Sequence, residues 1–439
     1  MRVLWITNFI PPVIASKLGF AGNNKEGWVA GLMNSLTNRH ETGTEIELSV
    51  AAPVPEDLIE GYYDNFDGVD FYGFHEDPAG VEYNEELEKT LCEIAEKAHA
   101  DVIHVFGTEY PHARALLEGI DKYSKSYDLS LNRVLIGMQG VVGEITYHYF
   151  DGLPGEVTSH DTFRDMLKND GLLAQRNKFV SRANNEMIAL SLAKNVTGRT
   201  PFDKEYVSKW ARSAVYYSMN ETLRPEFYDG VWDSSKAKEH SIFLSQANYP
   251  IKGMHNVLKA LPLILKKYPD TTVRVAGDSI TKHKSLKDKI KISGYGKYLV
   301  KLEKDVYKEC GFAPSIEYLG PLTAEQMKEE YLKASLFLCP STNENSPNSL
   351  GEAMLLGVPC VASNVGGIPG MMTDRIEGLL FEALDAEAMF SCIDSVWSDI
   401  SLRDRLCEAA KKRAEETHDA DRNFNRLLEI YREISGKEV

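Results

Sequence analysis

NENSPNSLGEAMLLGVP, from Asn343 to Pro359, is the most informative segment of this chain. Ser346 can cap a helix, and Pro347 suits the first helical position, because the N–H that proline lacks would have no partner there. Gly357 supplies a left-handed cap at the other end, and Pro359 prevents the helix from continuing. The stretch therefore predicts a loop followed by a short helix that ends at Gly357.

Apolar segments flank this helix on both sides. Ala334 to Cys339 predicts a buried strand that leads into the loop, and Cys360 to Ala362 predicts another strand after the helix. A helix that begins at the carboxyl end of a strand is a usual binding place for phosphates and nucleotides. Glu344 lies on the loop, and Glu352 lies about a turn and a half into the helix. Taken alone, this pair indicates only one carboxylate near the helix dipole and one in solvent.

The whole chain of 439 residues alternates predicted strands and helices, which indicates parallel sheets covered on both faces. The alternation pauses in a polar stretch at 220–240 and then restarts. We therefore predict an α/β protein with two doubly wound, Rossmann-like domains that face a cleft. The predicted parts are 1–219, the linker 220–240, 241–416 and a terminal helical segment at 417–439.

The composition fits an ordinary soluble globular protein, with 43% hydrophobic and 26% charged residues. No apolar run approaches the roughly 20 residues that a membrane helix needs. The short apolar start at residues 3–6 predicts a first strand rather than a signal peptide. The six cysteines include no C-x-x-C pair, so we expect reduced thiols and a cytoplasmic location.

The net charge of −16 argues against nucleic acid as a partner. Two segments, 164–212 and 252–301, nevertheless carry more Lys and Arg than acidic residues. Such segments are either solvated helix faces or a surface for diphosphates and anionic membranes. On the second interpretation, Lys284, Lys287 and Lys291 would support a weak, salt-sensitive association with the inner membrane face. On the first, these lysines are solvated and the acceptor is a soluble small molecule.

The spacing of Glu344 and Glu352, the glycine-flanked helix and the following NVGGIP at 364–369 resemble a known motif. It is the Glu-x7-Glu motif of retaining family-4 glycosyltransferases, of the bacterial surface or capsular polysaccharide type. The resemblance covers nearly the whole chain and is strongest from Ile242 to Leu380. It implies the GT-B fold, with an acceptor-binding first domain, a donor-binding second domain and a C-terminal helix that crosses back to the first. It also implies retaining, metal-independent hexosyl transfer from a nucleotide sugar to a hydroxyl of a glycan or lipid-linked acceptor, without a cofactor.

The resemblance assigns roles to residues of the second domain. Glu352 would hold the ribose hydroxyls of the donor, and Glu344 would meet the hydroxyls of its sugar as a catalytic residue. Lys252 matches the catalytic lysine that grips the pyrophosphate. Gln246 stands where the family usually has an arginine, so one diphosphate charge is less well neutralised. Further donor contacts are expected from Arg199, Gly277, Gly320, Pro321, Leu322, Asn345, Ser346, Pro347, Asn348 and Ser349.

On the acceptor side, Gly27 resembles the glycine at the start of the family's first helix, with a flexible loop as the alternative interpretation. Glu109 and His112 follow the fourth predicted strand and Gln139 follows the fifth, at the ends where chemistry is expected. Related enzymes often have a histidine where Gln139 stands. A glutamine in this catalytic position can form hydrogen bonds but cannot transfer a proton.

Two other activities stay open: a sugar-nucleotide epimerase of the same architecture, and a sugar-nucleotide-binding pseudoenzyme, which Gln246 and Gln139 make conceivable. No metal site is expected. The sequence Asp419-Ala420-Asp421 imitates a metal motif, but it opens the terminal helix, where acids pair with the helix dipole. Arg182 and Glu186, four apart, predict an ordinary salt bridge along a helix.

Overall fold

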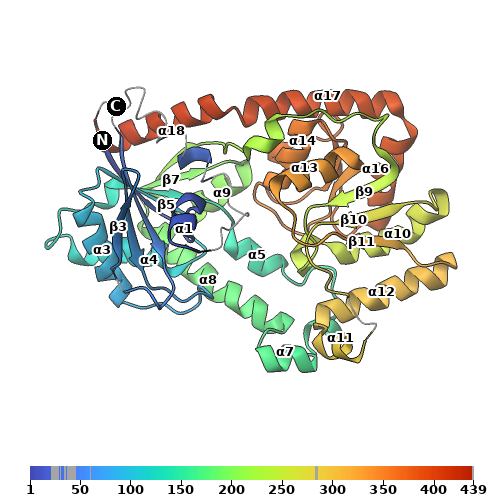
Figure 1. Cartoon of the computed structure of the whole chain (residues 1–439), viewed down its shortest axis with the longest axis horizontal. Coiled ribbons are helices and arrows are strands. Elements are labelled where there is room, and N and C mark those ends of the chain that lie inside the picture. Colours follow the sequence, from blue (N-terminus) through green and yellow to red (C-terminus); the bar gives the residue numbers. More distant parts are fainter. Residues whose placement is uncertain are drawn as a thin grey trace. The chain divides into compact units, whose positions relative to one another are not determined.

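The computed structural model describes residues 1–20, 29, 31–33, 36, 46–59, 61–281 and 285–437, apart from the side chains of 286, 287 and 289. The chain divides into two compact units, each built from separate segments. The first unit contains 1–143, 178–223 and 418–439, and the second contains 144–177 and 224–417. Figure 1 colours the chain from its first residue to its last.

The first unit is built on a sheet in the order β3-β4-β2-β1-β5-β6-β7-β8. The paired strands are parallel, except that β3 runs antiparallel to β4. Because β2 and β5 flank β1, the strand order reverses between β1 and β5. The strands are β1 (Arg2–Ile6), β2 (Glu47–Pro53), β3 (Tyr63–Phe66), β4 (Val69–Phe74), β5 (Val102–Phe106), β6 (Val134–Gly137), β7 (Asn195–Gly198) and β8 (Val215–Ser218).

Two apolar cores lie on the faces of this sheet. One contains Leu91, Leu116 and Val207, and the other contains Ile14 and Tyr431. The last of these belongs to the terminal helix, which therefore packs on the first unit, as the resemblance implies. The helices of this unit are α1 (Pro12–Lys17), α3 (Glu86–Lys97), α4 (Pro111–Tyr123), the later part of α8 (Leu172–Leu192), α9 (Pro201–Trp210) and α18 (Ala420–Ser435).

The second unit has a fully parallel sheet in the order β11-β10-β9-β12-β13-β14. This is the doubly wound 3-2-1-4-5-6 order, and its strand order reverses between β9 and β12. The prediction of two doubly wound α/β domains is therefore confirmed for each unit. The strands are β9 (Lys238–Leu244), β10 (Thr272–Val275), β11 (Ser315–Tyr318), β12 (Ala334–Cys339), β13 (Cys360–Ser363) and β14 (Leu379–Phe381).

Helices pack together in two groups around this second sheet. Helix α10 contacts α12 and α16, while α14 contacts α13 and α17 (Figure 1). None of the helices in the part of the chain that the structure describes is long and apolar enough to cross a membrane. The helices are α10 (Met254–Lys267), α11 (Leu286–Lys291), α12 (Gly294–Cys310), α13 (Ala324–Lys333), α14 (Asn348–Leu356), α15 (Ile368–Met371), α16 (Ala386–Ser398) and α17 (Ile400–Thr417).

Residues 144–177 differ from the predicted boundaries, which place them in the first domain. They carry the end of α5 (Val142–His148), α6 (Gly155–Thr158), α7 (Phe163–Lys168) and the start of α8. Hydrogen bonds explain their packing with the second unit. His255 Nε2 lies 3.0 Å from the Asp151 carbonyl oxygen, and Lys259 Nζ donates to the Gly152 carbonyl at 2.8 Å.

Candidate functional site

The strongest candidate site lies where the strand order of the second unit reverses. The loop after β9 ends in a short 3-10 turn, Pro250–Lys252, and the loop after β12 carries Glu344. Lys252 Nζ donates to Glu344 Oε1 at 2.6 Å. Burial opposes the charge of the ammonium, but the Glu344 carboxylate outweighs it and raises the pKa of Lys252 above its usual value. The structure thus brings together the two residues that the sequence assigned to the donor's phosphates and sugar.

Two glycines allow close backbone contacts next to this pair, Gly253 beside Lys252 and Gly366 beside Glu344. Gly253 has φ +73°, and a Cβ built on it would lie 1.9 Å from the Pro340 carbonyl oxygen. Gly366 has φ +51°, and its Cβ would lie 2.0 Å from the Glu344 carbonyl oxygen. The Gly367 N–H donates to that same carbonyl at 2.9 Å. Only glycine fits at either position, so the loops that carry Lys252 and Glu344 are fixed by close backbone contact.

The helix after Glu344 begins one residue later than predicted. Pro347 is its N-cap residue, Asn348 is its first residue, and no side chain caps it. The predicted cap by Ser346 is therefore wrong. Instead, Ser346 Oγ is buried and has no hydrogen-bond partner among the described residues. An unpartnered hydroxyl next to the N-terminus of a helix suits an anionic ligand, because the helix dipole is positive at that end. Gly357 ends the helix with φ +74°, as predicted.

Glu352 lies on α14 in a buried ion pair. Arg224 directs Nε and a terminal nitrogen to Glu352 Oε1, at 2.8 and 2.7 Å. Tyr331 Oη donates to Glu352 Oε2 at 3.4 Å. Burial raises the pKa of Glu352 to about 7, and Arg224 opposes that rise. No sequence pattern indicated Arg224, because it lies in the polar stretch assigned to the linker.

Gly277 and Gly320, predicted to border the donor base, face each other after β10 and β11. Their backbones exchange hydrogen bonds of 2.8 and 3.2 Å. Pro321 and Leu322 follow directly, and Gln246 lies half-buried on the loop after β9. Asn345, Pro347, Asn348 and Ser349 lie on the loop or in the first turn of α14.

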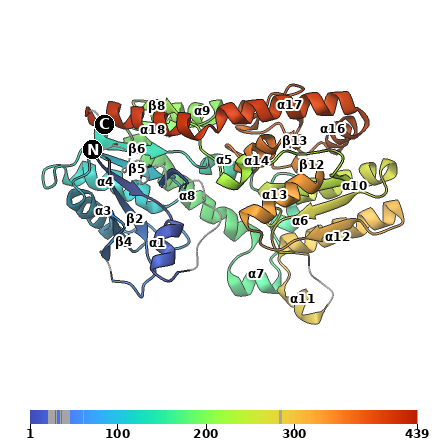
Figure 2. The same ribbon diagram turned by 45° about the horizontal axis from the view of Figure 1, so that its top comes forward.

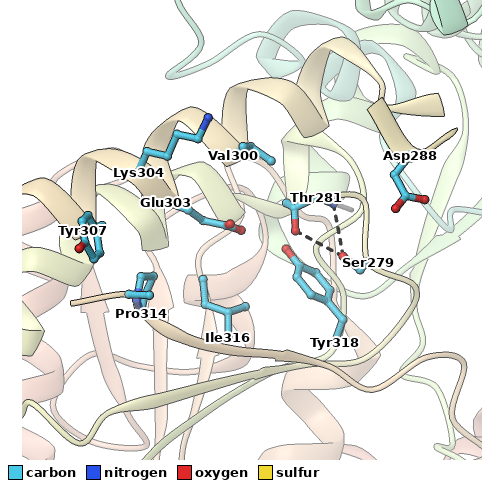
Figure 3. A pocket seen from close by; sticks show the side chains of 11 residues that line it. Ser279, Thr281, Asp288, Val300, Glu303, Lys304, Tyr307, Pro314, Ile316 and Tyr318 are labelled. Carbon is cyan, nitrogen blue, oxygen red and sulfur yellow. Dashed lines mark hydrogen bonds between the residues drawn. The ribbon is translucent and has the colours of Figure 1, made fainter. Parts of the chain in front are cut away.

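A cavity of about 670 Å³ lies beside the glycine pair, between α12 and the edge strand β11 (Figure 3). Ser279 and Tyr318, each two residues from one of the glycines, line it, together with Glu303. Lys252 and Glu344 do not line this cavity. It is therefore a separate feature from the ion pair at the switch point.

In the first unit, Arg199 and Gln139 form one hydrogen-bonded group. Arg199 forms a 2.6 Å ion pair with Glu221, and its other terminal nitrogen donates to the Gln139 carbonyl and to Oε1 at 3.3 and 3.2 Å. His418 Nδ1 lies 2.7 Å from the Glu221 carbonyl oxygen. The guanidinium predicted to bind the donor is thus occupied within its own unit.

Glu109 lies at the same strand ends and accepts a hydrogen bond from the Gly140 N–H at 3.1 Å. Close to it, Glu186 of α8 accepts from Thr108 Oγ1 at 2.6 Å and from the Gly143 N–H at 3.3 Å. Burial raises the pKa of Glu186 to about 7, and the neighbouring Glu109 adds to the rise. Sequence reasoning considered this carboxylate only as the partner of Arg182 in a salt bridge and missed its place next to Glu109.

The predicted salt bridge between Arg182 and Glu186 is wrong, because Arg182 donates to the Ala79 carbonyl. His112 is buried and its Nδ1 lies 3.0 Å from Glu76 Oε2, so it faces the interior of the unit. The prediction at Gly27 lies outside the described residues.

Comparison with known sequences finds similarity in the part of the chain that contains Lys252, Glu344 and Glu352. Residues 229–413 match the family described as Glycosyl transferases group 1. A D-inositol 3-phosphate glycosyltransferase of Corynebacterium urealyticum is 26% identical over 186 residues, which are 42% of this chain and 41% of that protein. An uncharacterized glycosyltransferase of Methanocaldococcus jannaschii is 25% identical over 203 residues, 46% of each chain. The chain thus spans less than half the length of these relatives.

Solved structures resemble the whole chain. Sucrose-phosphate synthase from Thermosynechococcus elongatus aligns with a TM-score of 0.69 and 14% identity over 99% of both chains. Anabaena HepE in complex with UDP-glucose aligns with a TM-score of 0.62 and 14% identity, over 98% of this chain and 99% of its own. At such identities the likeness concerns the fold. The chain therefore has the GT-B fold, and its residues 229–413 are similar to the glycosyl transferases group 1 family.

Proposed function

We propose that this protein is a retaining glycosyltransferase that moves a hexosyl group from a nucleotide sugar to a hydroxyl of a glycan or lipid-linked acceptor. The observation that carries the proposal is the Lys252–Glu344 pair in front of the α14 N-terminus, at the switch point of a doubly wound sheet. The family match over 229–413 supports the reaction class. The UDP-glucose bound by the fold relative HepE makes a uridine nucleotide sugar the first donor to test.

The two charges would divide the donor between them. The Lys252 ammonium and the backbone N–H groups at the start of α14, helped by Ser346 Oγ, would meet the pyrophosphate, where negative charge grows as the sugar departs. Glu344 would accept hydrogen bonds from the hydroxyls of the sugar and fix its orientation. In a front-face reaction the departing phosphate takes the acceptor's proton, so the chain needs no separate general base. No metal or cofactor forms part of this proposal.

The ribose and acceptor assignments are parts of the same proposal. Glu352 would bind the ribose hydroxyls beside Arg224, and Glu352→Gln should then weaken binding of the nucleoside itself. Glu109 and Gln139 would lie on the acceptor side, in the first unit. We place the enzyme in the cytoplasm, in surface polysaccharide synthesis, with weak peripheral association with the inner membrane face.

A panel of UDP, GDP and ADP sugars tests the function. Chromatography of the products should show transfer to an acceptor, or slow hydrolysis, with one of these donors. Glu344→Gln should abolish turnover yet leave diphosphate binding nearly intact. Glu329→Gln, an exposed change on α13 in the same unit, should alter neither. Interconversion of the sugars without transfer would support the epimerase, which the glycosyltransferase family match does not favour. Binding without any turnover would support the pseudoenzyme.

A further inference from the structure

The short helix α7 (Phe163–Lys168) has its apolar and charged faces reversed relative to an ordinary surface helix. Phe163, Met166 and Leu167 are 63, 64 and 77% exposed, although all are large and hydrophobic. At 100° per residue these three side chains share one face. Asp165, on the opposite face, is only 2% exposed. Surface helices normally turn their apolar face to the protein, so the reversal requires an explanation.

Polar contacts lock this orientation in place. Thr162 and Asp165 form a capping box, in which each side chain accepts from the other residue's backbone N–H. The same Asp165 carboxylate accepts from the Gly294 N–H at 2.7 Å, and Thr162 Oγ1 donates to the Ile292 carbonyl at 3.0 Å. Because the charged face of α7 is buried against residues 292–294, its apolar face is exposed to solvent. The exposed side chains therefore follow from a fixed geometry rather than from a loose end.

Neighbouring elements extend the apolar surface. Helix α11 (Leu286–Lys291) packs beside α7, as Figures 1 and 2 both show. Its Ile290 is 57% exposed, and Leu173, at the start of α8, is 50% exposed. We call Phe163, Met166, Leu167, Leu173 and Ile290 the α7 surface. All five belong to the second unit.

The charge next to the α7 surface identifies its partner. Lys168 follows Leu167, and Lys291 follows Ile290, and both lysines are exposed. Between residues 282 and 301 the sequence holds seven lysines and a single acidic residue, Asp288, in a chain whose net charge is −16. Exposed apolar side chains with Lys168 and Lys291 next to them match the boundary between anionic lipid head groups and acyl chains. An anionic bilayer offers negative head groups and an apolar layer to the same surface.

We propose that the α7 surface is a membrane-docking site. On docking, Phe163, Met166 and Leu167 would enter an anionic lipid bilayer, and Lys168 and Lys291 would meet its head groups. Only the biological role of this docking site rests on the proposed function: docking would hold a glycosyltransferase next to a lipid-linked acceptor. The site itself needs no catalysis.

Sedimentation with vesicles of phosphatidylglycerol and phosphatidylcholine, 1:1, tests the proposal on the full chain. The wild type should bind these vesicles, bind pure phosphatidylcholine much less, and dissociate in high salt. The triple variant Phe163→Ser/Met166→Ser/Leu167→Ser should lose at least about tenfold in partitioning. Lys168→Gln/Lys291→Gln should weaken binding to the anionic vesicles only.

Matched controls separate docking from general hydrophobicity. Val231 and Ile400, exposed to 66 and 61% in the same unit, lie outside the α7 surface. The double variant Val231→Ser/Ile400→Ser should bind vesicles like the wild type. Equal loss in this control, or failure of the wild type to bind anionic vesicles, would overturn the inference. So would a dimer in light scattering that the triple variant abolishes, because the surface would then join two copies. Thermal unfolding of each variant checks its folding.

Nucleotide binding by the same variants keeps the two proposals apart. If vesicle binding fails while nucleotide diphosphate still binds, the docking site is wrong and the proposed function stands. If vesicle binding follows the α7 surface while no sugar nucleotide binds or reacts, the docking site stands and the proposed function is wrong.

Discussion

Two hydrogen bonds from described residues reach the same carboxylate oxygen of Glu344. Lys252 Nζ and Ser341 Oγ each donate to Oε1, at 2.6 and 2.8 Å. The sequence contains no indication of Ser341 as a partner, because serine before a loop is common. The Ser341 hydroxyl fixes the same oxygen, Oε1, that accepts from the ammonium. On the proposed function, Lys252 would shift from Glu344 to a phosphate of the donor.

Lys252→Ala tests the phosphate role. The change should weaken nucleoside diphosphate binding roughly ten- to hundredfold, because a hydrogen bond to a charged group contributes about 1.5–3 kcal/mol. Affinity for the nucleoside should stay the same, since only the phosphates meet the ammonium. Calorimetry measures both affinities, with Lys266→Ala, an exposed change at the far end of α10, as the control. Equal losses for nucleoside and diphosphate would place Lys252 elsewhere on the donor.

The Arg224–Glu352 pair should matter for stability independently of any ligand. Removing one member of a buried ion pair leaves the other charge uncompensated, at a cost of about 3–5 kcal/mol. Arg224→Leu should therefore lower the denaturation midpoint of the second unit strongly. The double variant Arg224→Leu/Glu352→Leu should recover most of the loss. A single variant as stable as the wild type would mean that the pair contributes nothing.

Glu186 predicts how stability depends on pH. Burial raises its pKa from 4.5 to about 7 in the folded chain. Between these values the folded state keeps a proton that the unfolded state has released, so the free energy of unfolding falls as pH rises from 4.5 to 7. The full effect is roughly 3 kcal/mol.

Glu186→Gln stays neutral at every pH and should remove this part of the fall. Denaturant unfolding at pH 5 and pH 8 measures it, with the exposed Glu205→Gln on α9 as the control. The same pH dependence in the wild type and in Glu186→Gln would contradict the assignment.

Among the elements, the predicted bounds of helices and strands are most accurate where residues close together in sequence determine the structure. The loop, helix and strand from Asn343 to Ser363 depend on residues within a few positions of one another, and the structure differs only by one residue at the helix start and one at the strand end. The outcome was different where partners lie far apart in sequence. Arg224 joins Glu352 across 128 positions, and Glu186 joins Thr108 across 78. No local pattern marks such partners, so the pairing of each carboxylate had to come from the fold.

Gly366→Ala should test how tightly the glycine-rich turn positions Glu344. The added Cβ would lie 2.0 Å from the Glu344 carbonyl oxygen, at a φ of +51° that alanine adopts only with strain. The loop must therefore move, and turnover of the sugar nucleotide should fall by at least about tenfold. Gly311→Ala is the matched control, because Gly311 also has a positive φ, +80°, but no atom within 4 Å of its Cβ position. Equal turnover in both variants would show that the turn does not position the carboxylate.

On the scale of the whole molecule, each unit is built from segments that are separate in sequence, and the sequence did not indicate this division. The first unit takes three separate segments and the second takes two. Helix α8 begins in one unit and ends in the other, with no proline, glycine or change of composition at the boundary near residue 177. A linker of the usual kind was predictable at 220–240, because it is polar and poor in strands. A continuous helix gives no such signal.

The C-terminal helix α18 places a tyrosine hydroxyl in the core of the first unit. Tyr431 of α18 is fully buried, accepts from Trp5 Nε1 at 2.9 Å and lies 2.8 Å from His104 Nδ1. Burial lowers the pKa of His104 to about 3, so the imidazole is neutral and its Nδ1 can accept the tyrosine proton. One hydroxyl thus connects the C-terminal helix to the two strands, β1 and β5, that flank the reversal of strand order.

Tyr431→Phe keeps the ring and removes only this hydroxyl. The Trp5 N–H and the His104 nitrogen would lose their partner inside the core, which should cost about 1–3 kcal/mol. Hydrogen exchange of peptides from β1 and β5 should therefore accelerate, while peptides from β9 and β12 in the second unit keep the wild-type rate. Tyr307→Phe, an exposed change on α12, is the control and should leave both sets unchanged. Faster exchange in both units would mean that they unfold together, and unchanged exchange in β1 and β5 would mean that the terminal helix is held by its apolar contacts alone.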